Sequence, residues 1–124
     1  MTFGARRKRF GQSGEAAASA FLVQKGYRLL AANFRTSAGE IDLVCRDAHT
    51  LVFVEVKTRR TDAFGAPEDA VTIQKQQKIR RVAEGYLAAH GWQGAETARF
   101  DVVSLTPAPD GVLRAELFRD AFQF

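Results

Sequence analysis

Two carboxylates and a lysine lie in or beside apolar stretches of the sequence, where ionised side chains are costly. Asp42 lies within the apolar run 41–45. Glu55 and Lys57 lie at the end of a second run, 51–56. A buried charge is unfavourable unless another group pairs with it, or it gives up its charge by taking a proton. These three residues are therefore the first candidates for chemistry.

Both runs are predicted to be β-strands of one hairpin. If Arg46 pairs with Leu51, antiparallel pairing places Asp42 directly opposite Glu55. Neighbouring strands lie about 4.8 Å apart, so the two carboxylates would nearly touch. Like charges that face each other destabilise a sheet, and this pair therefore needs a partner.

Three arrangements would remove the repulsion. A hard cation such as Mg²⁺ binds carboxylate oxygens at about 2.0–2.1 Å and keeps several waters for a substrate phosphate. The two carboxyl groups could instead share a proton. The third arrangement is structural: the same register places Glu40 opposite Lys57 as a salt bridge, and Asp42 would bond turn amides near Gly39. The strand pattern alone leaves all three open.

Lys57 favours the metal arrangement. It lies on the same strand face as Glu55, two residues further along. An ammonium in that place can hold an attacking water or offset charge that develops on a phosphoryl oxygen. A solvated strand end is the alternative interpretation of Lys57.

The elements that position these residues follow from apolar periodicity and from helix caps. We expect one helix over residues 13–25, capped by Ser13, and a second between Thr72 and Gly91. The predicted strands are residues 27–34, 40–46, 51–58, 99–105 and 112–118. The order α-β-β-β-α-β-β predicts an α+β fold, similar to an α/β/α sandwich, with a mixed central sheet.

Composition indicates one globular domain of 124 residues, with 46% hydrophobic and 26% charged residues. No apolar run approaches the roughly 20 residues that span a membrane, and the basic start lacks the features of an export signal. The single cysteine, Cys45, excludes a disulfide framework. We therefore expect a cytoplasmic protein that does not bind a membrane.

The positive charge is concentrated at the start of the chain. The net charge is +4, which equals the number of positive charges in the cluster Arg6, Arg7, Lys8 and Arg9. We predict that residues 1–10 form a basic flexible arm and residues 11–124 the single domain. A basic arm on a neutral body suits nucleic acid as a partner, although a solvated terminus would have the same composition.

The segments around these residues resemble the YraN-like family of bacterial proteins, which is related to endonucleases. Asp42 followed by Glu55-Val56-Lys57 is similar to the core motif of PD-(D/E)xK nucleases, with Ile41 in place of the proline. The matching segments are "GEAAASAFLVQKGY", "NFRTSAGEIDLV", "LVFVEVKTRR", "FGAPEDAV", "IQKQQKIRRVAEGYL" and "RFDVV".

The resemblance implies a restriction-endonuclease-like core, related to archaeal Holliday-junction resolvases, that uses Mg²⁺ or Mn²⁺. It implies that Asp42 and Glu55 bind the metal, that the Val56 carbonyl is a further ligand, and that Lys57 is the catalytic lysine. Glu15 matches a first-helix acid that approaches the metal through water. A helix-start acid favoured by the helix dipole is the alternative for Glu15.

The resemblance also indicates residues that would contact nucleic acid. Gln74 and Lys75 match the place where related nucleases put a polar residue beside the site. Lys75 and Lys78 are predicted to contact phosphates, as are Arg59 and the basic cluster at residues 6–9. We expect the pair Arg99–Asp101, in contrast, to be structural.

These features lead to three hypotheses. The first is a Mg²⁺- or Mn²⁺-dependent endonuclease acting on DNA, with branched or damaged structures as candidate substrates. A homodimer is one candidate form, by analogy with nucleases that make two cuts, and the sequence itself does not indicate an oligomeric state. The second is a nucleic-acid-binding module with the same fold and little activity of its own, acting within a repair or recombination complex. The third is a small α+β interaction protein with a structural ion pair.

Overall fold

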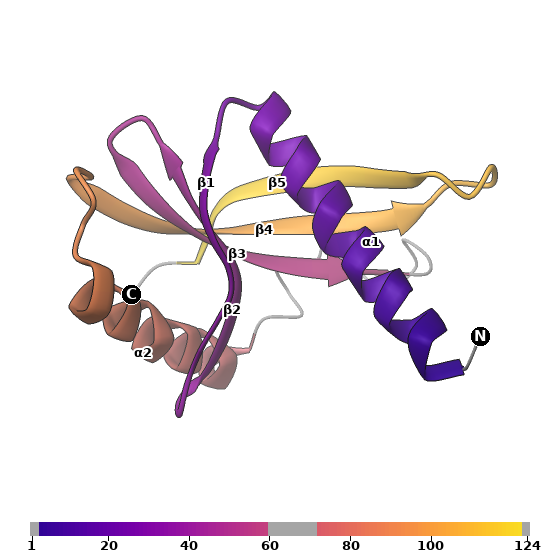
Figure 1. The fold of residues 1–124 in the computed structure, drawn as a ribbon. Helices are drawn as coiled ribbons and strands as arrows, with labels where there is room; N and C mark the ends of the chain where they lie inside the picture. Colours follow the sequence, from indigo (N-terminus) through magenta and orange to yellow (C-terminus); the bar gives the residue numbers. More distant parts are fainter. Residues whose placement is uncertain (1–2, 60–71, 123–124) are drawn as a thin grey trace.

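The structure, a computed structural model, describes residues 3–59 and 72–122, with side chains from residue 14 onward. Its elements follow the predicted order α-β-β-β-α-β-β. They are α1 (Phe3–Gln24), β1 (Arg28–Thr36), β2 (Gly39–Asp47), β3 (Thr50–Thr58), α2 (Ile73–His90), β4 (Thr97–Pro107) and β5 (Leu113–Phe122), shown in Figure 1. The α+β fold class is therefore confirmed.

The described strands form one mixed sheet in the order β1-β2-β3-β4-β5. Neighbouring strands are antiparallel except for β3 and β4, which are parallel. Parallel neighbours need a long crossover connection, and α2 lies in the segment between β3 and β4. This crossover carries the start of α2 to the end of β3 that holds Glu55 and Lys57.

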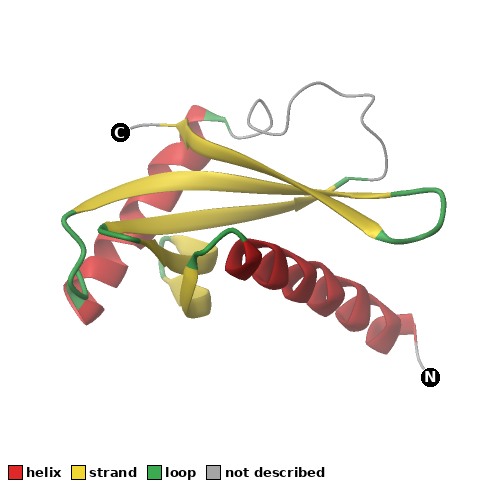
Figure 2. Ribbon diagram, turned by 90° about the horizontal axis from the view of Figure 1, so that it is seen from above, coloured by secondary structure: helices red, strands yellow, loops and turns green. Residues whose placement is uncertain are grey.

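The two helices cover separate hydrophobic cores. Alternate residues of β3 enter them: Leu51 and Phe53 pack with α2, whereas Val52 and Val54 pack with α1. Side chains on a strand alternate between faces, so the two cores lie on opposite faces of the sheet. Figure 2 shows the strands between the helices. The molecule thus has the three-layer arrangement expected from the sequence.

The second helix matches its prediction closely. Thr72 is its N-cap, and the side-chain hydroxyl accepts a hydrogen bond from the Lys75 N–H at 3.2 Å. Gly91 ends the helix with a φ of 69°, which glycine adopts without strain. The apolar face of α2 lies in or against the core and consists of Ile79, Val82, Ala83, Tyr86 and Leu87.

The predicted start of the first helix is wrong. α1 begins at Phe3 and not at residue 13, so Ser13 is not its cap and residues 3–10 have helical backbone. The segment "FGAPEDAV", one of those that carry the family resemblance, lies outside the described residues. Neither described helix has the length and apolar character needed to cross a membrane.

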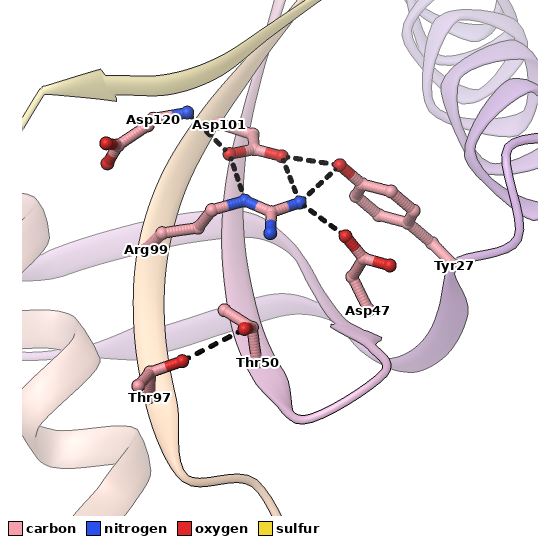
Figure 3. A network of polar contacts seen from close by, with 7 residues as sticks. All are labelled: Tyr27, Asp47, Thr50, Thr97, Arg99, Asp101 and Asp120. Atoms are coloured by element: carbon pink, nitrogen blue, oxygen red, sulfur yellow. Dashed lines mark hydrogen bonds and ion pairs between the residues drawn. The ribbon is translucent and has the colours of Figure 1, made fainter.

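A partly buried polar network lies at one end of the sheet, as Figure 3 shows. It joins Tyr27, which precedes β1, with residues of β2, β4 and β5, the last through the Asp120 N–H, which donates to Asp101. The Arg99 guanidinium lies 3.0 Å from the Asp101 carboxylate and 2.9 Å from that of Asp47. Tyr27 donates its hydroxyl to Asp101 at 2.8 Å, and burial, aided by that carboxylate, raises the pKa of Tyr27 to about 12. The predicted structural pair of Arg99 and Asp101 is therefore confirmed.

Replacement of Asp101 should be strongly destabilising. Asp101 is 0% exposed, and its loss leaves the Arg99 guanidinium and the Tyr27 hydroxyl without their main acceptor. We expect Asp101→Ala to lower the free energy of unfolding by about 3–5 kcal/mol, measured by urea denaturation. Glu84→Ala removes one member of an exposed helix pair and should cost less than about 1 kcal/mol. Equal losses in the two variants would contradict this structural role.

Candidate active site

The ladder between β2 and β3 stops just before the candidate carboxylates. Its pairs include Arg46 with Leu51, as predicted, and the last of them in the described strands is Leu43 with Val54. The next position in this register would be Asp42 opposite Glu55. The two strands therefore part at the point where these side chains lie.

Asp42 occupies the gap that the ended ladder leaves. Its Oδ2 accepts a hydrogen bond from the Val56 N–H at 2.7 Å. A side-chain carboxylate thus replaces the backbone carbonyl that a continued ladder would supply. The N–H and C=O of one strand residue point toward the same neighbouring strand, so the Val56 carbonyl faces this gap too. The bond to Val56 also differs from the structural alternative, in which Asp42 bonds turn amides near Gly39.

The salt bridge between Glu40 and Lys57, which the structural alternative required, does not form. Glu40 lies opposite Arg35 on β1, and their charged groups are 3.3 Å apart. Lys57 instead pairs with Glu55 on its own strand, with 3.4 Å between Nζ and Oε1. The cause is the end of the ladder, because β2 no longer lies in register with β3 at Glu40.

The two carboxylates affect each other as their spacing in the sequence suggested. Burial raises the pKa of Asp42 from 3.8 to about 7, and the nearby Glu55 carboxylate adds to the shift. The hydrogen bond from Val56 acts in the opposite direction. Burial and the repulsion by Glu55 together outweigh the backbone bond, and Asp42 holds a proton more readily than an ordinary aspartate.

The first turn of α2 adds a second lysine to this group. The hydrogen bond between Lys75 and Lys57 lowers the pKa of Lys75, and burial lowers it further. For Lys57, burial favours the neutral form, but the Lys75 amine and the Glu55 carboxylate outweigh it and raise the pKa. Lys57 and Lys75 thus lie together beside the carboxylates, and Lys75 gives up its proton more readily than Lys57. Gln74 and Lys78, the neighbouring helix candidates, are exposed.

The first helix brings Glu15 to the other side of Asp42. A cavity of about 180 Å³ is lined by Gly14, Glu15, Asp42, Val56 and Thr58. α1 packs close to the end of β3 here, since a Cβ at Gly14 would lie 3.4 Å from the Thr58 hydroxyl, at van der Waals contact. The placement of Glu15 beside Asp42 agrees with the family resemblance.

Asn33, which was not among the predicted site residues, holds Glu15. Asn33 donates its side-chain N–H to Glu15 Oε2 at 3.0 Å. A signal was present, since pairing the predicted strands 27–34 and 40–46 around their short turn puts Asn33 across from Asp42. Thr58, which lines the same cavity, was missed as well.

The donor atoms at this site suit a hard cation. Asp42 and Glu55 supply carboxylate oxygens and Val56 a carbonyl oxygen, which are the ligand types that Mg²⁺ and Mn²⁺ prefer. Across residues 3–59 and 72–122, no group of three or more His, Cys, Asp or Glu is arranged to hold a metal. Mg²⁺ commonly uses only one or two protein carboxylates and keeps several waters, so this donor set fits it.

The other residues predicted to contact nucleic acid lie at the end of a described segment or outside the described side chains. The Arg59 backbone N–H donates to the Leu105 carbonyl at 2.8 Å, which continues the contact of β3 with β4. The side chains of Arg6, Arg7, Lys8 and Arg9 lie outside the described part of the chain. Their contact with phosphates stays a prediction.

Fold and site together define the class: an α+β protein with a five-stranded mixed sheet and a carboxylate–lysine site where two strands part. Residues 14–105 match the family described as "Uncharacterised protein family UPF0102", and the chain belongs to that family. The resemblance drawn from the sequence is thereby confirmed at the level of family.

Similar proteins cover nearly the whole chain. A UPF0102 protein of Symbiobacterium thermophilum is 50% identical over 115 residues, which are 93% of this chain and 97% of that protein. UPF0102 proteins of Desulfosudis oleivorans and Geobacter sulfurreducens are 46% identical over 117 residues and 44% identical over 116 residues. These matches cover 94% of this chain in both cases, and 92% and 90% of the respective relatives.

The raised pKa of Asp42 predicts a pH-dependent stability of the metal-free protein. The pKa of this carboxyl rises from 3.8 in the unfolded chain to about 7 in the fold. Its protonation therefore stabilises the fold fully at pH values below 3.8, and this contribution is lost as the pH rises through about 7. The free energy of unfolding of the wild type, minus that of Asp42→Asn, should therefore fall between about pH 4 and pH 8. Urea denaturation in EDTA measures this difference, and a difference that rises with pH would contradict the assignment.

Proposed function

We propose that this chain is a Mg²⁺- or Mn²⁺-dependent endonuclease that hydrolyses phosphodiester bonds in DNA, with branched or damaged structures as candidate substrates. The observation that carries the proposal is the parting of β2 and β3, which gathers Asp42, Glu55, Lys57 and the Val56 carbonyl in one place. The family resemblance to PD-(D/E)xK nucleases supports the same assignment. The proposal extends beyond family membership, because a fold alone does not fix an activity.

The two carboxylates are suited to hold the cation. Asp42 and Glu55 repel each other when both are ionised in the metal-free protein. A divalent cation between them would attract both carboxylates and so offset that repulsion. When bound, the cation would lower the pKa of a water and neutralise charge on the phosphate. The Val56 carbonyl can add a third oxygen.

Lys57 is suited to act on the phosphate or on the attacking water. Its pKa is raised, so it is an ammonium at neutral pH, and its contact with Glu55 fixes its Nζ near the carboxylates. A fixed ammonium stabilises negative charge that develops during attack on phosphorus. Lys75, beside it on α2, provides a second group that can contact the same phosphate.

The nucleic acid would contact residues that surround this centre. Gln74, Lys75 and Lys78 come from the first two turns of α2, and Arg59 follows β3. The cluster at residues 6–9 also belongs to α1 and lies on the N-terminal side of Glu15. Such phosphate contacts bind the backbone of DNA and would position the scissile bond without reading the sequence.

Cleavage should depend on the metal and on both carboxylates. We expect Asp42→Asn and Glu55→Gln each to lower the cleavage rate by at least about a hundredfold, because each removes charge that holds the cation. The assay compares labelled duplex, single-stranded, flap and four-way-junction DNA in Mg²⁺, Mn²⁺ or EDTA.

Glu40→Gln is the matched control for these variants. It removes a carboxylate from the same strand as Asp42, but this carboxylate pairs with Arg35 and not with Lys57. Cleavage should persist in Glu40→Gln. Cleavage that persists in Asp42→Asn and Glu55→Gln would contradict the proposal, and DNA binding without cleavage by the wild type would favour the binding-module hypothesis.

Binding to DNA should weaken steeply with salt. Each phosphate contact contributes roughly 0.9 to the slope of log affinity against log salt concentration on duplex DNA. Replacement of Arg6, Arg7, Lys8 and Arg9 by glutamine should therefore make the slope shallower, measured by fluorescence anisotropy with labelled duplex. An unchanged slope would show that this cluster makes no phosphate contact.

A further inference from the structure

Asn33 has an unusual backbone conformation in the middle of β1. Its φ is 54°, in the left-handed region that residues with a side chain rarely adopt, although Asn tolerates it better than most. β1 is an edge strand in the order β1-β2-β3-β4-β5, so a distortion here disturbs pairing with a single neighbour. Backbone outliers of this kind concentrate at functional sites.

The distortion coincides with one in the neighbouring strand. The ladder pairs on either side of Asn33 keep one register, so this residue stands across from Asp42. β2 changes face at the same point, because Ile41 and Val44 both enter the core under α2 while Leu43 enters the core under α1. Strict alternation would have placed Ile41 with Leu43. The irregular position of β1 therefore lies beside the irregular position of β2.

The side chain of Asn33 extends to the first helix. Its Nδ2 donates to Glu15 Oε2 at 3.0 Å, and Glu15 lines the cavity that also contains Asp42 and Val56. A hydrogen bond to a carboxylate is stronger than one between neutral groups. A glutamate has several rotamers, and this bond favours those that keep its carboxylate on the β1 side of the cavity.

We propose that Asn33 is a positioning residue of the candidate site, whose left-handed backbone and amide together hold the Glu15 carboxylate beside Asp42. Glu15 then adds negative charge and hydrogen-bond acceptors to the place where the cation would bind. This inference rests on the proposed function, because it concerns the same ion. Groups of this kind, which orient others around a metal, typically change metal affinity by about 10–100-fold when they are removed.

Calorimetric titration of Mn²⁺ into the DNA-free protein tests this role. Asn33→Gly is the variant of choice, because glycine adopts a positive φ without strain and removes only the amide. We expect it to bind Mn²⁺ roughly tenfold more weakly without a lower melting temperature. In the Glu15→Gln background, Asn33→Gly should have no further effect, since the residue acts through Glu15.

Ala48→Gly provides the control. Ala48 has a similar φ of 52° and lies in the turn between β2 and β3. This turn follows the end of β2 that lies away from Gly39 and Asp42. Its replacement should leave Mn²⁺ affinity unchanged.

The possible results separate this inference from the proposed function. Equal Mn²⁺ affinity in the wild type and Asn33→Gly would overturn the role of Asn33 and leave the endonuclease proposal standing. If Asn33→Gly lowers Mn²⁺ affinity by the same factor in the wild type and in the Glu15→Gln background, the role of Asn33 is overturned as well. A wild type that binds no Mn²⁺ would overturn the proposed function, and the inference with it.

Discussion

The hydrogen bond from the Val56 N–H to Asp42 Oδ2, at 2.7 Å, marks the feature on which the candidate site depends. A continued ladder would join β2 and β3 through backbone groups and leave no polar gap between them. Because the pairs end at Leu43 with Val54, one carboxylate lies between the strands and the Val56 carbonyl faces the same space. The raised pKa of Asp42 is the electrostatic consequence, since two acids then share a partly buried place.

The rest of the fold keeps this opening in place. At the far end of the sheet, the network of Tyr27, Arg99 and Asp101 joins strands through charge-assisted hydrogen bonds that are buried or partly buried. The helices act on the opening itself: α1 places Glu15 on one side, and the first turn of α2 places Lys75 on the other. The strands thus pair at one end of the hairpin and part at the other, where the polar gap lies.

Much of this could be predicted from the sequence, for physical reasons. The hairpin register followed from a short polar connection between two apolar runs, and Thr72 and Gly91 mark the ends of α2 by their cap chemistry. The Glu40–Lys57 contact that the register suggested does not form, because strand patterns do not show where a ladder ends. The predicted start of α1 is wrong, because the helical backbone continues on the N-terminal side of Ser13, the predicted cap. Asn33 escaped notice because its role depends on a left-handed backbone and a contact with a distant helix.

The most direct test of the account is a crystal of the protein soaked in Mn²⁺ at a pH above the pKa of Asp42, followed by an anomalous difference map. The account predicts one strong peak between the carboxylates of Asp42 and Glu55, within bonding distance of the Val56 carbonyl, and no such peak in a crystal of Glu55→Gln. A map without a peak at this position, or with the metal bound elsewhere on the chain, would contradict it.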